Sequence, residues 1–70
     1  LVGASLKGIH ASDVNFTGAN LAGANLRDAK LTGAILSSAN LSGADLTGAD
    51  LRDAKVVGTN LDGVIGYVKP

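Results

Sequence analysis

The chain repeats every five residues, and this period limits the possible folds more than any other feature. All ten leucines occupy positions whose numbers leave a remainder of one on division by five. Nine of the ten glycines lie two places after this leucine phase, and nine of the eleven alanines lie three places after it. The register does not slip between Leu6 and Gly66. Repetition at a fixed short period indicates a stacked architecture in which each unit contacts its neighbours.

A five-residue period fits neither a helix nor a straight strand. On an α-helix, residues five apart are rotated by about 500°, so successive leucines would scatter around the axis. On a strand, an odd spacing sends successive leucines to opposite faces. Local alternation still holds, since Ala19-Asn20-Leu21 is apolar, polar, apolar, and two residues precede the next alanine. If those two residues turn a corner, all Ala and Leu face one interior, which predicts a β-solenoid with Gly and Asp at its corners.

Seven consecutive pentads carry a specific motif. They read Ala-Asn-Leu-Ala-Gly, Ala-Asn-Leu-Arg-Asp, Ala-Lys-Leu-Thr-Gly, Ala-Ile-Leu-Ser-Ser, Ala-Asn-Leu-Ser-Gly, Ala-Asp-Leu-Thr-Gly and Ala-Asp-Leu-Arg-Asp. This run resembles the pentapeptide-repeat family, and the resemblance covers about residues 4–66. It implies an all-β fold, a right-handed quadrilateral β-helix with four pentapeptides per coil and with the Leu and Ala side chains inward. Residues 1–66 would then form about three coils, followed by a C-terminal end segment at residues 67–70.

Departures from the repeat support this register. Ile9 is large for an alanine position, whereas the neighbouring central position holds the small Ala11. In the same way, the large Val64 occupies an alanine position and is followed by the small Gly66 at a central position. Such exchanges conserve volume, as a close-packed interior requires. Tyr67 and Pro70 follow the repeat and are expected to close its C-terminal end.

The outward positions suggest structural roles. If residues twenty apart are stacked, Asn20, Asn40 and Asn60 form one column, and we expect their amides to hydrogen-bond to one another. His10 has no nucleophile, base or metal ligand at a suitable spacing, so we interpret it as a solvated surface residue. The charged side chains of the segment Leu-Arg-Asp-Ala-Lys, which occurs at residues 26–30 and 51–55, are expected to form weak exposed ion pairs.

Composition excludes several classes of function. There is no cysteine, and six basic residues balance six acidic ones. A neutral chain gives no electrostatic reason to bind nucleic acid. The aspartates are all at outward phases on flat walls, so no cleft for acid–base catalysis is predicted. We therefore expect no enzyme activity, no cofactor and no metal, and no apolar run is long enough to span a membrane.

One side of the predicted solenoid is distinguished by its low charge. Its only charged residue is Lys55, and two apolar residues occupy outward positions there. We interpret this side as a partner surface, which consists of Asn15, Ile35, Ser37, Lys55 and Val57.

The main hypothesis is a non-catalytic structural or protein–protein interaction module. Its partner would be another protein or a neighbouring domain. The alternative is a DNA mimic that binds a type II topoisomerase such as gyrase, as some pentapeptide-repeat proteins do, although the neutral charge and short length argue against it. The chain begins in phase without a methionine, which suggests either part of a longer protein or an open end that associates with another copy. It carries no targeting signal, and a soluble module is expected whose compartment the sequence leaves unknown.

Overall fold

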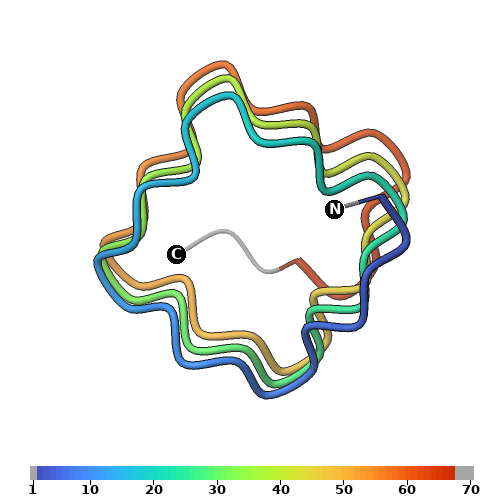
Figure 1. The fold of residues 1–70 in the computed structure, drawn as a ribbon, viewed down its shortest axis with the longest axis horizontal. Coiled ribbons are helices and arrows are strands. Elements are labelled where there is room, and N and C mark those ends of the chain that lie inside the picture. Colours follow the sequence, from blue (N-terminus) through green and yellow to red (C-terminus); the bar gives the residue numbers. More distant parts are fainter. Residues whose placement is uncertain (1, 68–70) are drawn as a thin grey trace.

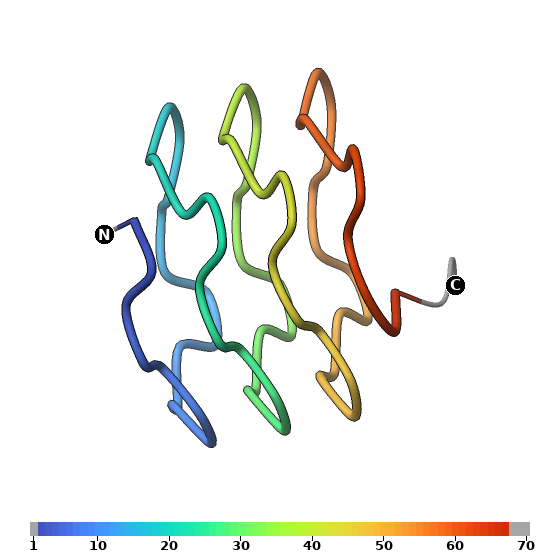
Figure 2. The same cartoon turned by 90° about the vertical axis from the view of Figure 1, so that its right-hand side faces the viewer.

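The backbone winds around a central axis as a four-sided tube. The computed structural model describes residues 2–67, and its outline is nearly square when seen along the axis (Figure 1). Seen from the side, the successive turns lie next to one another (Figure 2). All the β-bridges are parallel and join residues twenty apart: Ser5–Asn25, His10–Lys30, Asn15–Ile35, Asn20–Asn40, Asn25–Asp45, Lys30–Asp50, Ile35–Lys55, Asn40–Asn60 and Asp45–Ile65. The predicted β-solenoid is therefore confirmed.

Its regular structure is reduced to isolated bridges and turns. One residue in every five, from Ser5 to Ile65, forms a bridge, and two-residue turns separate the bridges. Within residues 2–67 no helix and no strand longer than one bridge residue occurs. Each side of the tube is consequently a column of bridge residues, one from each coil. Backbone hydrogen bonds of 2.7–3.0 Å on either side of each bridge, as at Lys30 and Ile35, hold neighbouring coils together.

The β-turns between bridges explain why glycine recurs at one position of the pentapeptide. In a representative turn, the N–H of Ala24 donates to the carbonyl of Leu21 at 3.0 Å, and Gly23 between them has a φ of 67°. A positive φ at the third residue is the geometry of a type II turn, which favours glycine. Four other residues adopt this conformation without being glycine, with φ between 60° and 64°: Asp13, Asp28, Ser38 and Asp53.

Leucine and alanine fill the interior. Six leucines are 1% exposed: Leu21, Leu26, Leu31, Leu36, Leu41 and Leu46. The alanines of the central turns are equally buried, and Ala34 is 0% exposed. Ile9 and Ala11 both belong to this core, Ala11 as one of its buried residues and Ile9 packed against it. The interior is thus assembled from one large and one small side chain on each side of the tube.

The chain changes direction after the last bridge residue. After Ile65 the backbone turns into the outline of the tube (Figure 1), and half-buried Tyr67 packs against the core. Gly66 has a φ of 72°, and a Cβ atom there would lie only 2.7 Å from the Cα of Thr47. A glycine is needed at this position because the backbone passes so close to Thr47 of the preceding coil. Pro70, expected to assist this closure, lies outside the described residues.

The asparagine column does not form the expected amide ladder. The Oδ1 atoms of Asn20, Asn40 and Asn60 accept hydrogen bonds from backbone N–H groups two residues later, at 3.0–3.2 Å. No hydrogen bond joins two asparagine side chains within residues 2–67. The same local bond forms at Asp45 and Asp50. These side chains therefore stabilise the turn that follows them, as Asx motifs do.

Candidate functional site

The five residues of the predicted partner surface lie together on one side of the tube. Parallel bridges place Ile35 between Asn15 and Lys55. The adjoining positions are aligned by backbone hydrogen bonds, from Gly18 N–H to the Ser37 carbonyl and from Ser38 N–H to the Val57 carbonyl, both at 3.0 Å. We call this surface, Asn15, Ile35, Ser37, Lys55 and Val57, the Ile35 wall.

The two apolar residues of the Ile35 wall differ in exposure. Val57 is 76% exposed, whereas Ile35 is only partly exposed because it lies between the bridge residues of the turns before and after it. Asn15 is exposed, but its Oδ1 accepts hydrogen bonds from the N–H and hydroxyl of Thr17 at 2.9 and 2.6 Å. Val57 is therefore the main apolar contact that this wall offers to another molecule.

Sequence reasoning missed three other exposed apolar residues. Val2, Val14 and Ile65 are 67%, 40% and 55% exposed. Ile65 could have been found from its phase, because it occupies a bridge position that is mostly polar elsewhere. Val14 occupies an inward phase and is exposed because it lies in the first turn, which no earlier turn covers among residues 2–67.

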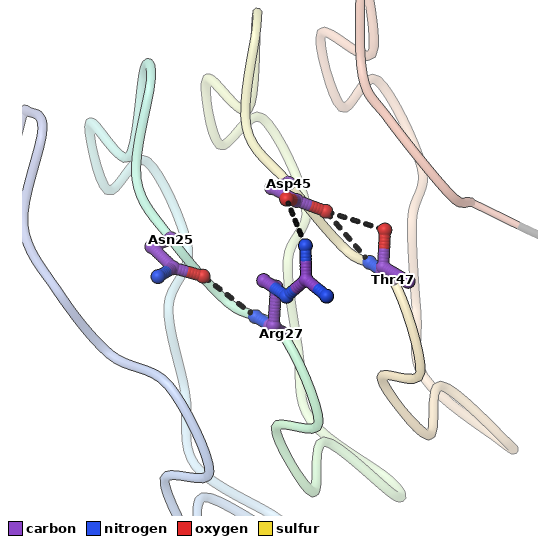
Figure 3. A network of polar contacts seen from close by, with 4 residues as sticks. All are labelled: Asn25, Arg27, Asp45 and Thr47. Carbon is purple, nitrogen blue, oxygen red and sulfur yellow. Dashed lines mark hydrogen bonds and ion pairs between the residues drawn. The ribbon is translucent and has the colours of Figure 1, made fainter.

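A polar network joins adjacent turns on another side of the tube (Figure 3). A guanidinium nitrogen of Arg27 lies 3.4 Å from a carboxylate oxygen of Asp45 in the next turn. The N–H and hydroxyl of Thr47 donate to the other Asp45 oxygen at 3.0 and 2.6 Å, while Asn25 accepts from the Arg27 N–H at 3.1 Å. The Thr47 hydroxyl is the main reason why the pKa of Asp45 is lowered, and Arg27 contributes. Since the ion pair is exposed, its stabilisation is small.

Asp50 and Arg52 form a second ion pair within one turn. The guanidinium donates two hydrogen bonds to the carboxylate, at 3.0 and 2.8 Å. These bonds, together with the Arg52 backbone N–H, lower the pKa of Asp50 from 3.8 to about 2. The expectation of exposed ion pairs is therefore confirmed. One pair joins two adjacent coils, and the other lies within a single coil.

The lowered pKa of Asp50 predicts an acid-dependent loss of stability. Because the folded pKa is about 2 and the ordinary value is 3.8, the ionised carboxylate contributes fully above about pH 4 and loses its contribution as the pH falls toward 2. Thermal unfolding followed by circular dichroism should show a falling Tm over this interval. In Asp50→Asn, which retains an oxygen for the Arg52 N–H, the fall should be smaller. An equal fall in both proteins would contradict the assignment.

Within residues 2–67 the walls offer no enclosed site. No pocket is found there, and no group of three potential metal ligands occurs in that part of the chain. The bridge neighbour of His10 is Lys30, which is neither a nucleophile partner nor a metal ligand at neutral pH. The described residues contain no helix that is long and apolar enough to cross a membrane.

Comparison with known families identifies the architecture. The model for pentapeptide repeats matches in eight copies, over residues 1–37 and 36–65. The chain belongs to the pentapeptide-repeat family. The two matched ranges cover nearly all of the chain that forms the bridged turns, so the resemblance in sequence and the observed architecture agree. A search of the curated proteins gave no match.

Solved structures of other pentapeptide-repeat proteins are closely similar. A protein from the thylakoid lumen of Arabidopsis thaliana is 39% identical, with a TM-score of 0.89, and the match covers 91% of this chain and 44% of that one. Rfr23 from the cyanobacterium Cyanothece 51142 is also 39% identical, with a TM-score of 0.89 over 93% of this chain and 45% of its own. This pentapeptide-repeat chain thus spans less than half the length of either protein.

Proposed function

We propose that this pentapeptide-repeat chain is a non-catalytic module that presents the Ile35 wall to another protein or to a neighbouring domain. The observation that carries the proposal is the exposure of Val57, 76%, on a side where Lys55 is the only charged residue among residues 2–67. A flat side with little charge is inexpensive to desolvate, since few ions lose their hydration on contact. Two polar residues lie on the same wall, since Ser37 is beside Val57 in the preceding coil and Asn15 is beside Ile35.

The proposal includes a finer description of the scaffold. It is a right-handed quadrilateral β-helix of about three coils at residues 1–66, followed by an end segment at residues 67–70. The bridges between residues twenty apart support it, because four pentapeptides then complete one coil. In such a solenoid the outward side chains can vary without altering the interior, so each wall is available for recognition.

The test compares two variants, Val57→Asp and Ile65→Asp, in each of which aspartate replaces an exposed apolar residue. A photo-activated cross-linker at position 57 would first identify a bound protein in the source cells, and binding of that purified protein would then be measured. We expect Val57→Asp to weaken binding by about tenfold or more, as loss of a central apolar contact costs over 1 kcal/mol. Ile65→Asp changes an exposed residue, 55% exposed, outside the Ile35 wall and should leave binding unchanged.

The control for folding is the circular dichroism spectrum and Tm of each variant. Both side chains are more than half exposed, so neither substitution should unfold the solenoid. Unchanged binding by Val57→Asp, or an equal loss in Ile65→Asp, would exclude the Ile35 wall as the contact surface.

The alternative of a gyrase-binding DNA mimic has no support from the comparisons. The charges argue against it as well, because six acidic residues are balanced by six basic ones. The aspartate at bridge position 50 pairs with Arg52, and the one at position 45 contacts Arg27. No wall within residues 2–67 therefore presents the uncompensated acidic column that mimicry of a phosphate backbone requires.

A further inference from the structure

Four corners of the solenoid carry a side chain where glycine would avoid backbone strain. We call the residue with positive φ in each pentapeptide the corner residue. It is glycine at most corners between residues 3 and 63, whereas four corners hold other residues: Asp13, Asp28, Ser38 and Asp53. A residue with a Cβ atom adopts this conformation at a cost that glycine does not incur. Neither Asp13 nor Asp28 forms a salt bridge within residues 2–67, so charge pairing does not explain their presence.

The first two of these aspartates fill space beside the corner of the next coil. A Cβ atom on Gly33 would overlap Oδ1 of Asp13, twenty residues earlier. A Cβ atom on Gly48 would overlap Oδ1 of Asp28 in the same way. Nothing lies within 4 Å of the equivalent position at Gly43, where the preceding corner is also glycine. The carboxylate of an aspartate corner therefore takes the place of a side chain at the corner one coil later.

We propose that an aspartate corner selects glycine at the corner of the next coil, and that Asp13 and Asp28 thereby help to hold this chain at twenty residues per coil. The order of the interior residues does not specify that number, because central positions stack on central positions at every spacing that is a multiple of five. Ser38 is too short to act in the same way, since its Oγ would lie 3.8 Å from a Cβ atom on Gly58. The proposal concerns the stacking of the coils and is independent of the Ile35 wall.

The selection is strongest against a second aspartate. A single methyl group at the next corner can be accommodated if the aspartate side chain rotates to another staggered conformation. Two aspartates would have to share the same space, because neighbouring coils lie only about 4.8 Å apart. Both carboxylates are ionised at neutral pH. They would therefore repel each other as well as compete for space.

The corner residues agree with stacking at twenty residues and conflict with stacking at the two adjacent multiples of five. At twenty, Asp13 precedes Gly33 and Asp28 precedes Gly48. At fifteen, Asp13 would face Asp28. At twenty-five, Asp28 would face Asp53. A slip of one pentapeptide in either direction therefore brings two carboxylates together, although every Leu and Ala would keep its inward position.

Paired glycine-to-aspartate substitutions test the contact. Gly33 and Gly43 have nearly equal φ angles, 71° and 69°, so the cost of placing a side chain on this backbone is matched. Gly33→Asp would stand between Asp13 and Asp53 in one column, whereas Gly43→Asp has glycine corners in the coils before and after it. We expect the Tm of Gly33→Asp, followed by circular dichroism, to be lower than that of Gly43→Asp by about 5 °C or more. Adding Asp13→Gly should raise the Tm of Gly33→Asp more than that of Gly43→Asp.

Two insertions test the register itself. The pentapeptide Leu-Ser-Gly-Ala-Asn is added after Asn20 in one protein and after Lys30 in the other, so both have the same length, composition and order of interior residues. The first insertion brings Asp28 to the corner one coil after Asp13, whereas the second leaves glycine one coil after each of these aspartates. We expect the first protein to melt about 5 °C or more below the second. Asp13→Gly, introduced into both proteins, should remove this difference.

The second insertion also separates Arg27 from Asp45. Loss of that exposed ion pair would lower the Tm of the second protein, and would therefore reduce rather than create the expected difference. Equal Tm values for the two insertion proteins, or a difference that persists after Asp13→Gly, would overturn the proposal. Equal Tm values for Gly33→Asp and Gly43→Asp would overturn it as well.

Discussion

Leu36→Ala is expected to lower the free energy of unfolding by about 3 kcal/mol. Leu36 is 1% exposed in the middle turn, where the interior has neighbours on both sides. Removing its side chain leaves a cavity that the backbone cannot close, because hydrogen bonds of 2.7–3.0 Å hold this coil to the coils on either side. Urea unfolding followed by circular dichroism measures the change.

Leu6→Ala is the matched control for this substitution. Leu6 has the same phase and residue type but lies in the first turn, where it is only partly buried. We expect a loss of about 1 kcal/mol, since little transfer free energy and no closed cavity are involved. Equal losses at the two positions would contradict a core that is most tightly packed in its middle turn.

Ala34→Leu is expected to destabilise the chain by about 2 kcal/mol through overpacking. Ala34 is 0% exposed and lies two residues from Leu36 on the same side of the tube. The walls cannot move apart to accommodate three more carbon atoms, because every side is tied to its neighbours by the backbone ladder. The same unfolding experiment measures this loss.

The double variant Ala34→Leu/Leu36→Ala should be more stable than the sum of the two losses predicts. It exchanges the large and small side chains, as Ile9 and Ala11 do in the first turn. A favourable coupling of about 1 kcal/mol or more is expected, because volume is conserved between contacting residues. Additive losses would show that the exchange at Ile9 and Ala11 has another cause.

The fold could be predicted from the sequence because one constraint repeats without interruption. The odd period excluded a helix and a straight strand, and the positive φ at Gly23 and its equivalents confirms the corners that this reasoning required. The same pattern could not predict how outward polar side chains bond. Asn20 stabilises its own turn rather than Asn40, since a local N–H two residues away is nearer than an amide in the next turn.

The sequence predicted that the residues of the proposed partner surface lie side by side, but it did not predict how exposed each of them is. Their positions within the pentapeptide predict that Ile35 and Val57 point outward. The bridges bring their two columns together as expected. Phase does not report how much of Ile35 its neighbours cover, because that depends on the side chains of Asn15 and Lys55 in the turns on either side. The identity of the surface as a contact remains a prediction to be tested by Val57→Asp.

The bridges between residues twenty apart also determine how this chain tolerates changes in length. An insertion of twenty residues would add one complete turn and leave every later residue on its original wall. An insertion of five would keep the interior intact but move every later residue a quarter turn, onto the next wall. The segment Leu-Arg-Asp-Ala-Lys occurs at residues 26–30 and again at 51–55, twenty-five residues apart, so its copies lie on adjacent walls. A duplication can therefore give a pentapeptide-repeat protein the same side chains facing a new direction.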